Sequence, residues 1–343
     1  MKSTNPRLLA LFQKRIEGDD ALLELARLRF RKAGLGAEFY AANPAELEWL
    51  LRFRPNNTAP VVVHLPRDIN LLDQRDIAGI IHFMVTSAGL VNGFVLHDQS
   101  EIVTVQYQAA LTEIDTALQC CTSKPILFIE YAVGLEPAFF CELHERLKNL
   151  QNVSACIDIG HLGIYYVREL YSKIHSNHDI CSLHPLDPNL PELVEDVQNA
   201  VDTVLTKVLS VVRQLASLGK PLHFHLHDGH PLSTLSPFGV SDHLSFFEKI
   251  PIPFAFKGKK ELSTLFGPKG LEKIIAVATA SLDFDSLTFS LEIHPTEGRL
   301  PLGDASHLFN HWKIKTNAEK MNYWLSVLLE NHRLLSSIVN KTR

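Results

Sequence analysis

Residues 153–162 read VSACIDIGHL, a nearly continuous apolar stretch that carries an aspartate and then a histidine at its far end. Apolar runs of this kind are typical of strands that helices cover on one side and that pack inside a sheet on the other. A carboxylate is kept in such surroundings only when it is paired, hydrogen-bonded or bound to a metal. The stretch therefore predicts a buried strand whose end, at Asp158 and His161, opens onto a site.

Comparable apolar runs alternate with helical patterns along the chain. Helices are expected at 19–34, 44–54, 71–89, 102–121 and 191–219, and strands at 8–14, 36–42, 59–66, 93–98, 125–134, 153–162, 221–228 and 287–295. About eight strands, each followed by a helix, predict an α/β fold of the (β/α)8 TIM-barrel type, with residues 1–343 as a single domain. An open doubly wound sheet is the alternative. However, no GxGxxG turn follows the first strand, so no dinucleotide site is indicated.

Two connections are too long for simple turns between a strand and a helix. Residues 163–190 are rich in His, Asn and Pro, and residues 229–270 show no strong period. Long connections of this kind are usually functional or disordered. We expect them to form long loops at the carboxyl-terminal face of the strands, as walls or lids of an active site.

Composition narrows the function classes. The 343 residues are 46% hydrophobic and carry a formal net charge of −5, which argues against nucleic acid as a partner and leaves a small-molecule substrate. The five cysteines form no CxxC pair, so a reduced, cytoplasmic protein is expected. No apolar run of about 18 residues predicts a membrane helix. A homo-oligomer is left open.

Six successive predicted strands deliver ionisable side chains at similar points near their ends. In a parallel barrel these ends share one face, where sites form. Several carboxylates and imidazoles together call for a compensating cation, and their mixed oxygen and nitrogen donors suit Mn²⁺, Mg²⁺, Co²⁺ or Zn²⁺. Cys156 lies two residues before Asp158, one layer deeper, and is assigned to the packed core. The side chains are His64, His97, Glu130, Asp158, His161, His225, His227 and Glu292.

These strand ends, in this order, resemble the xylose isomerase-like TIM barrels, a superfamily of sugar isomerases and epimerases that also includes the family-2 apurinic endonucleases. CIDIGHLGIY resembles the family's D-x-x-H motif, and HFHLHDG its H-x-(K/N)-D strand end. FIEYAVG resembles E-N-x-x-G, with Tyr131 in place of Asn, and SLEIHP resembles the last strand's glutamate. The resemblance implies a divalent metal ion held by Glu130, Asp158, His225 and Glu292, with His161 beside it in contact with the substrate.

Other stretches are similar to the endonuclease branch. HLPRDINLL resembles its H-x-P-x-x-x-N-L stretch, and His97 falls where that branch has another histidine, although Asp98 and Gln99 replace its Pro-Gly. The branch has a D-x-H in a later loop, where this chain has Asp242 and His243 side by side. The resemblance therefore implies additional contacts to metal or substrate from His64, His97, His227, Asp228, Asp242 and His243.

Three functions remain open at this point. The first is a metal-dependent isomerase or epimerase of a small sugar or related polyol. Its catalytic residues would be Glu130 and Glu292, which exchange protons across a metal-stabilised enediolate, and His161. The second is a metal-dependent phosphodiesterase resembling the apurinic endonucleases. The third is a metal-binding barrel with redox activity or with no catalytic activity.

Overall fold

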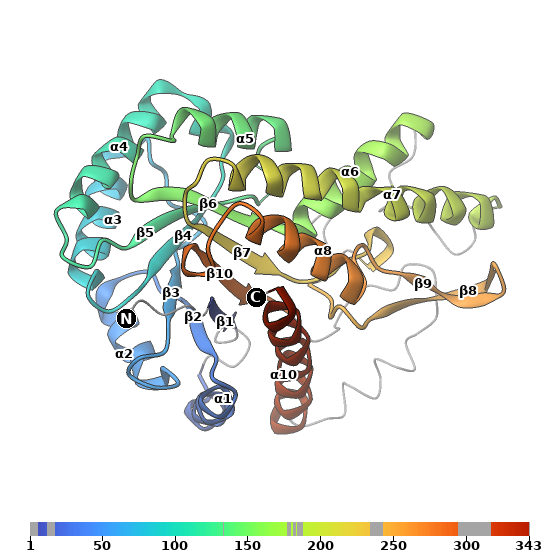
Figure 1. The fold of residues 1–343 in the computed structure, drawn as a ribbon, viewed down its shortest axis with the longest axis horizontal. Coiled ribbons are helices and arrows are strands. Elements are labelled where there is room, and N and C mark those ends of the chain that lie inside the picture. Colours follow the sequence, from blue (N-terminus) through green and yellow to red (C-terminus); the bar gives the residue numbers. More distant parts are fainter. Residues whose placement is uncertain are drawn as a thin grey trace. The chain divides into compact units, whose positions relative to one another are not determined.

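The structure is a computed structural model that describes residues 6–11, 18–132, 134–176, 180, 183, 188–233, 243–293 and 317–342. Within these residues, eight parallel strands close into a barrel in the order β1-β10-β7-β6-β5-β4-β3-β2 (Figure 1). The predicted α/β barrel fold is confirmed. The barrel strands are β1 Arg7–Leu11, β2 Gly36–Tyr40, β3 Val61–His64, β4 Gly93–His97, β5 Ile126–Glu130, β6 Val153–Asp158, β7 Leu222–Leu226 and β10 Leu287–Leu291.

The contacts within the chain define two compact units. The first comprises Met1–Ile157, Gln214–His225 and Ser281–Leu291 and holds nearly all of the barrel strands. The second comprises Asp158–Arg213, Leu226–Ala280 and Glu292–Arg343. That the chain is a single domain stays a prediction.

The helices of the first unit begin and end where capping chemistry places them. The Asp19 side chain accepts a hydrogen bond from Leu22 N at the start of α1, and Gly34 ends this helix with a φ of 74°. Asn43 caps α2 in the same way, with Pro44 in its first turn. The main helices are α1 Asp20–Ala33, α2 Pro44–Leu50, α3 Gln74–Ser87, α4 Val105–Gln119 and α5 Pro137–Arg146, and the short 3-10 helices are η2 Leu51–Phe53, η3 Ser100–Val103 and η6 Phe284–Ser286.

The barrel interior is filled by side chains from alternate positions of the strands. One buried cluster contains Leu9, Val62, Val95, Phe128 and Cys156. Its members come from five different strands, so it ties the first unit together. The assignment of Cys156 to the packed core is confirmed.

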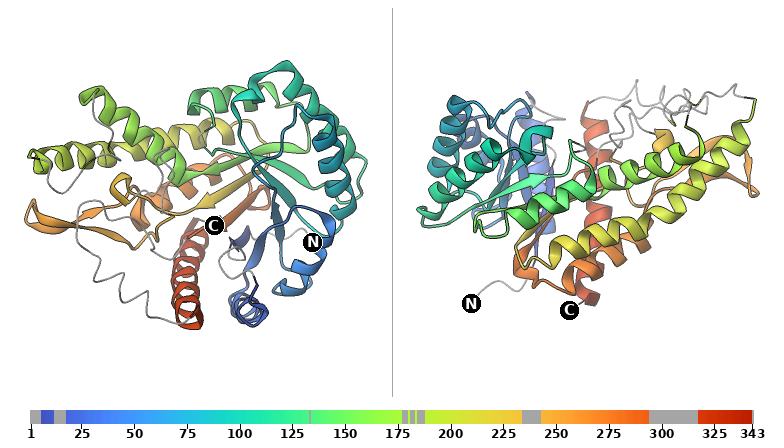
Figure 2. Two further views of the ribbon diagram at one scale, coloured as in Figure 1. Left: turned by 180° about the vertical axis from the view of Figure 1, so that it is seen from behind. Right: turned by 90° about the horizontal axis from the view of Figure 1, so that it is seen from above.

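The second unit contains most of the structure that the sequence patterns missed. Helix α6 packs antiparallel to α7 (Figure 2). Two side-chain contacts show the direction: Glu169 bonds Lys207 at 3.0 Å, and the later His175 bonds the earlier Asp196 at 2.8 Å. The other elements in its described residues are an antiparallel hairpin, two helices and a 3-10 turn. The elements are α6 Ile159–Ile174, α7 Leu190–Ala216, η5 Pro231–Ser233, β8 Lys249–Phe256, β9 Lys259–Ser263, α8 Gly267–Thr279 and α10 Asn317–Thr342.

Three predictions, one about a strand and two about connections, are wrong. The stretch 153–162 is not one strand, because α6 begins at Ile159, and 163–190 is helical through Ile174. The connection 229–270 is not an extended loop, since it contains the β8–β9 hairpin, whose turn at Lys257 and Gly258 has positive φ values. Prolines at 251 and 253 hid this strand, because proline usually argues against a paired strand. No helix in the described part of the chain is long and apolar enough to cross a membrane.

Candidate metal centre

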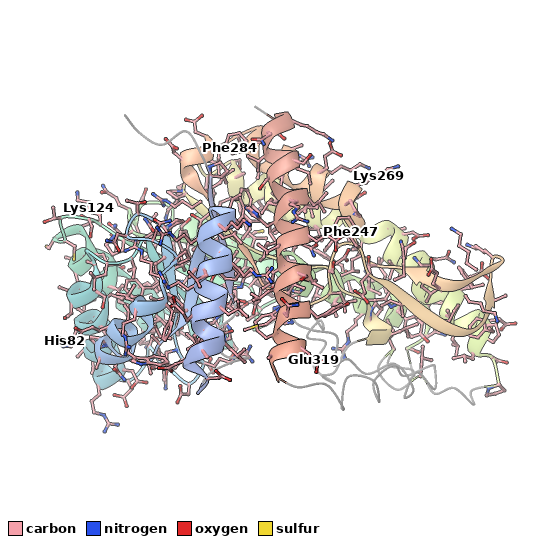
Figure 3. The ribbon with its side chains drawn as sticks, turned by 90° about the horizontal axis from the view of Figure 1, so that it is seen from below. His82, Lys124, Phe247, Lys269, Phe284 and Glu319 are labelled. Atoms are coloured by element: carbon pink, nitrogen blue, oxygen red, sulfur yellow. The ribbon has the colours of Figure 1, made fainter. Side chains whose placement is uncertain are left out.

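Three imidazoles surround one carboxylate at the strand ends of the first unit. Glu130, the last residue of β5, has imidazole nitrogens close to both of its carboxylate oxygens. Its Oε2 lies 2.9 Å from His64 Nε2 and 3.2 Å from His97 Nε2. Its Oε1 lies 3.1 Å from His225 Nδ1. All four side chains are buried. By contrast, His82 on the outer side of α3 is exposed to solvent (Figure 3). The strand-end histidines are therefore a distinct, inward-facing set.

A second buried carboxylate contacts His225, one of these histidines. Glu38 of β2 contacts His225 Nε2 at 2.9 Å with Oε1 and His223 Nε2 at 3.1 Å with Oε2. Both Glu38 and His223 are fully buried, and neither was a predicted site residue. Residues two apart on a strand share a face, so the HFHLH pattern could have placed His223 beneath His225. Glu38 offered no such signal, because it is an isolated acid in GAEFY.

The contact of His64 Nδ1 indicates which ring nitrogen of His64 carries a hydrogen. His64 Nδ1 lies 3.0 Å from the Leu65 carbonyl oxygen, which can only accept, so Nδ1 carries the hydrogen. In a neutral ring, Nε2 then presents a lone pair to a Glu130 oxygen 2.9 Å away. Two acceptors in contact require a proton or a cation between them. His225, held between Glu38 and Glu130, raises the same requirement, since a neutral ring donates to only one of them.

The pKa shifts of His64 and Glu130 agree with the need for a proton or a cation between them. Burial lowers the pKa of His64, but its hydrogen bond to Glu130 and the charges of Glu130 and Glu38 outweigh burial and raise the pKa overall. Burial raises the pKa of Glu130, but the charges of His225 and His97 hold this pKa well below its usual range. Without a metal, the His64–Glu130 pair therefore shares a proton, and a divalent cation in the same place would replace it.

The second unit repeats the arrangement with different residues. His227 Nε2 lies 2.9 Å and 3.0 Å from the two oxygens of Asp158, while His227 Nδ1 contacts the Asp228 carbonyl oxygen at 2.9 Å. In a neutral His227 ring, Nε2 would again present an unprotonated nitrogen to a carboxylate. Burial lowers the pKa of His227, but the charge and hydrogen bond of Asp158 raise it overall. His161 and His243 complete a buried group of four whose donor atoms all lie within 4.8 Å of one another.

His161 is held over Asp158 by the start of α6. Its backbone N–H donates to Asp158 Oδ1 at 2.7 Å, so Asp158 caps the helix that carries His161. The His161 ring packs edge-on against His227 and His243, and its Nε2 has no hydrogen-bond partner among the described residues. Gly160 allows this close packing, because a Cβ there would lie 2.0 Å from the His227 ring. A buried imidazole nitrogen without a partner fits a metal or substrate contact.

Asp228 is engaged by the protein backbone. Its Oδ1 accepts from Gly229 N at 2.8 Å and Phe266 N at 3.2 Å, and its Oδ2 accepts from Gly267 N at 2.7 Å and the Thr264 hydroxyl at 2.8 Å. These bonds fasten the start of α8 to the end of β7. The contacts assign Asp228 a structural role beside His227.

The remaining predicted residues fall as follows. Glu292 is buried directly after β10; its backbone N–H donates to Leu226 O at 3.2 Å, and its side-chain Oε1 lies 3.5 Å from His243 Nε2. Asp242 lies outside the described residues. Of the four ligands that the resemblance implies, Glu130 and His225 belong to the first unit, and Asp158 and Glu292 to the second. A single site built from all four stays a prediction.

Each unit therefore carries its own group of donors for a cation. In the first, the donor atoms of His64, His97 and Glu130 lie within 4.8 Å of one another, as do those of Glu38, His64 and His225. Mixed imidazole and carboxylate donors fit the divalent ions expected from the sequence.

No family model and no curated protein matches this chain. Among solved structures, the chain is similar to a xylose isomerase domain protein from Planctomyces limnophilus, at 9% identity and a TM-score of 0.44, over 91% of this chain and 92% of that one. The closed barrel of eight strands by itself shows the (β/α)8 fold.

Proposed function

We propose that this protein is a divalent-metal-dependent isomerase or epimerase of a small sugar or related polyol. The metal dependence is supported chiefly by His64 and His227. Each ring donates Nδ1–H to a backbone carbonyl and turns Nε2 toward a buried carboxylate. A divalent cation resolves both contacts without a shared proton.

The donors divide into holding and reacting groups. A bound cation supplies Lewis acidity toward adjacent carbonyl and hydroxyl oxygens of a sugar. Glu130, with imidazoles against both of its oxygens, is better suited to holding the ion than to moving protons. Glu292 is then the proton-transferring carboxylate, and His161 Nε2 orients a substrate oxygen.

A metal-dependent phosphodiesterase is the second candidate. It is favoured by one observation: each unit has its own histidine-rich donor group, which suggests more than one cation per chain. Several cations suit phosphate chemistry, since they can activate water and balance charge on the phosphate. The net charge of −5 weighs against a nucleic acid substrate.

Metal content and two assays separate these functions. The full chain is reconstituted with Mn²⁺, Co²⁺ or Zn²⁺, the metal is counted by elemental analysis, and candidate ketoses are followed for loss of solvent-exchangeable hydrogen. With Mn²⁺, about one ion with exchange supports the isomerase; two or more ions with nicking of abasic duplex DNA support the phosphodiesterase. If no metal binds under any condition, both functions are wrong and the barrel serves another purpose.

Glu292→Gln tests the proton-transfer role. The variant keeps the shape of the side chain but cannot accept a proton, so hydrogen exchange should fall by at least ~100-fold, the usual scale of general acid–base catalysis. The exposed Glu272→Gln on α8 is the matched control. Circular dichroism checks that both variants fold. Retained exchange in a folded Glu292→Gln protein removes Glu292 from the mechanism.

A further inference from the structure

A group of donors that includes a cysteine lies next to the Glu130 group in the first unit and shares His225 with it. Cys156 on β6 and His223 and His225 on β7 offer donor atoms that all lie within 4.8 Å of one another. None of the three side chains has measurable exposure to solvent. The sequence resemblance assigns only His225 to metal binding and leaves Cys156 and His223 without a role.

An unpartnered ring nitrogen of His223 indicates a bound ligand at this group. Its Nε2 contacts the Glu38 carboxylate at 3.1 Å, whereas its Nδ1 has no hydrogen-bond partner among the described residues. When Glu38 accepts the Nε2 hydrogen, Nδ1 is left with a lone pair inside a fully buried ring. An unsatisfied buried polar atom costs about 1–3 kcal/mol, so a partner at Nδ1 is favoured.

Glu38 gives the group the surroundings of a metal site. Metal-binding histidines usually donate their other ring hydrogen to a carboxylate, which fixes the ring and makes it a better ligand. Glu38 contacts one nitrogen of His223 and one of His225 and is itself fully buried, so it orients both rings. It also supplies negative charge against a bound cation.

We propose that Cys156, His223 and His225, oriented by Glu38, form an inner site for a zinc-class ion. A thiolate and two imidazoles suit Zn²⁺ or Co²⁺ and disfavour Mg²⁺ and Mn²⁺, which prefer oxygen donors. On binding, the Cys156 thiol releases its proton to solvent and a sulfur–metal bond forms. His225 Nε2 contacts Glu38, so Nδ1, which also lies 3.1 Å from Glu130 Oε1, is the ring nitrogen that would serve the inner ion.

The site does not depend on the proposed function, because no strand-end donor group of that function contains sulfur. Its presence is therefore detected by a signal that the Glu130 and Asp158 groups cannot produce. That signal is the near-ultraviolet sulfur-to-cobalt charge-transfer band of a thiolate-bound Co²⁺.

The experiment titrates the full-length, metal-stripped protein with Co²⁺ alone and records its absorption spectrum. The wild type should develop the charge-transfer band, and Cys156→Ser should lose it. His223→Gln should shift its midpoint to at least ~10-fold higher Co²⁺. Cys141→Ser is the matched control, since Cys141 is also buried but belongs to none of the donor groups in the described residues; its band should be unchanged.

X-ray absorption at the zinc edge of the wild type provides a measurement without a variant. It should show a sulfur neighbour at about 2.3 Å. Absence of the charge-transfer band or of the sulfur neighbour in the wild type overturns the inner site. A band that survives in folded Cys156→Ser protein does so as well.

Discussion

At the residue scale, the two central histidines are set up by the same local geometry. His64 and His227 each stand at the end of a strand, and each ring bonds the carbonyl of the next residue, Leu65 or Asp228. A contact between neighbours in sequence thus decides which nitrogen faces inward. Because the carbonyl takes Nδ1–H, Nε2 is left for the shared proton or for a cation that replaces it.

His64→Gln should weaken divalent metal binding. Glutamine cannot place an unprotonated ring nitrogen against Glu130, so the dissociation constant for Zn²⁺ should rise by at least ~10-fold. Isothermal titration calorimetry measures the change. The exposed His82→Gln on α3 is the control and should bind as the wild type does. Equal affinity in folded His64→Gln protein would show that His64 is not a ligand.

His144 makes the protein sensitive to acid outside the metal centre. Burial, aided by the charge of Lys220, lowers the pKa of His144 to about 3, far below the value of 6.5 in an unfolded chain. The unfolded state therefore binds a proton at this histidine below about pH 6.5. In the folded state, His144 stays neutral down to about pH 3. Stability is thus lost as the pH falls through this window, by about 2 kcal/mol between pH 8 and pH 5 from this group.

The test is His144→Leu, which removes the buried titrating ring at similar volume. Urea unfolding at pH 8 and pH 5 should show a smaller loss of stability in the variant than in the wild type. His82→Leu controls for the loss of an exposed histidine and should keep the wild-type loss. The same acid-induced loss in His144→Leu as in the wild type would contradict the assignment.

At the element scale, the site depends on abrupt changes from strand to helix. Asp158 ends β6 and caps α6 with one side chain, and Asp228 fastens β7 to the start of α8. Each carboxylate lies at or beside a predicted site residue and also satisfies backbone N–H groups. Helix starts therefore fix the positions of His161 and His227 more firmly than loops would.

Gly79→Ala in α3 should stabilise the protein. Gly79 lies inside the helix on its exposed side and lines a cavity of about 220 Å³, and a Cβ there would meet no atom within 4 Å. Alanine should raise the free energy of unfolding by about 0.5–1 kcal/mol, because it restricts the unfolded chain more than glycine does. Guanidinium denaturation measures the gain.

Gly36→Ala is the contrasting variant on β2. A Cβ at Gly36 would lie 2.2 Å from the Pro60 carbonyl oxygen, so the backbone must shift and stability should fall by about 1–3 kcal/mol. A loss of stability in Gly79→Ala, or none in Gly36→Ala, would show that these contacts are wrongly placed.

At the scale of the whole molecule, the chain buries several carboxylates whose negative charge needs compensation. Glu38, Glu130, Asp158 and Glu292 are all less than 5% exposed, alongside several histidines. Such groups oppose folding unless protons or cations compensate them. A bound metal should therefore stabilise the entire fold.

Removal of metal should lower the melting temperature. At a free metal concentration of 100 times the dissociation constant, binding adds about 2.7 kcal/mol, which corresponds to several degrees in a protein of this size. Differential scanning calorimetry of metal-loaded and chelator-treated protein measures the shift, and added Zn²⁺ should reverse it. An unchanged melting temperature after verified metal loss would contradict a stabilising centre.

The sequence by itself determined the barrel and most of the strand-end residues. Continuous apolar runs with ionisable ends predicted eight strands, and parallel strands in a barrel present their carboxyl ends on one face. Helix caps such as Asp19 and Gly34 set boundaries through interactions within a few residues. These features are local or periodic, so they can be read from the order of residues.

Only the tertiary structure decided which ionisable groups meet. Glu38 joins His223 and His225 across 185 and 187 residues of sequence, and no local pattern signals such a contact. The β8–β9 hairpin was hidden because its prolines oppose the usual strand pattern, which the pairing of the two strands overrides. The carboxylates that face His64 and His227 are likewise chosen by contacts between distant parts of the sequence. Sequence periodicity specifies which face a side chain shares, whereas its partners are chosen by barrel closure and burial.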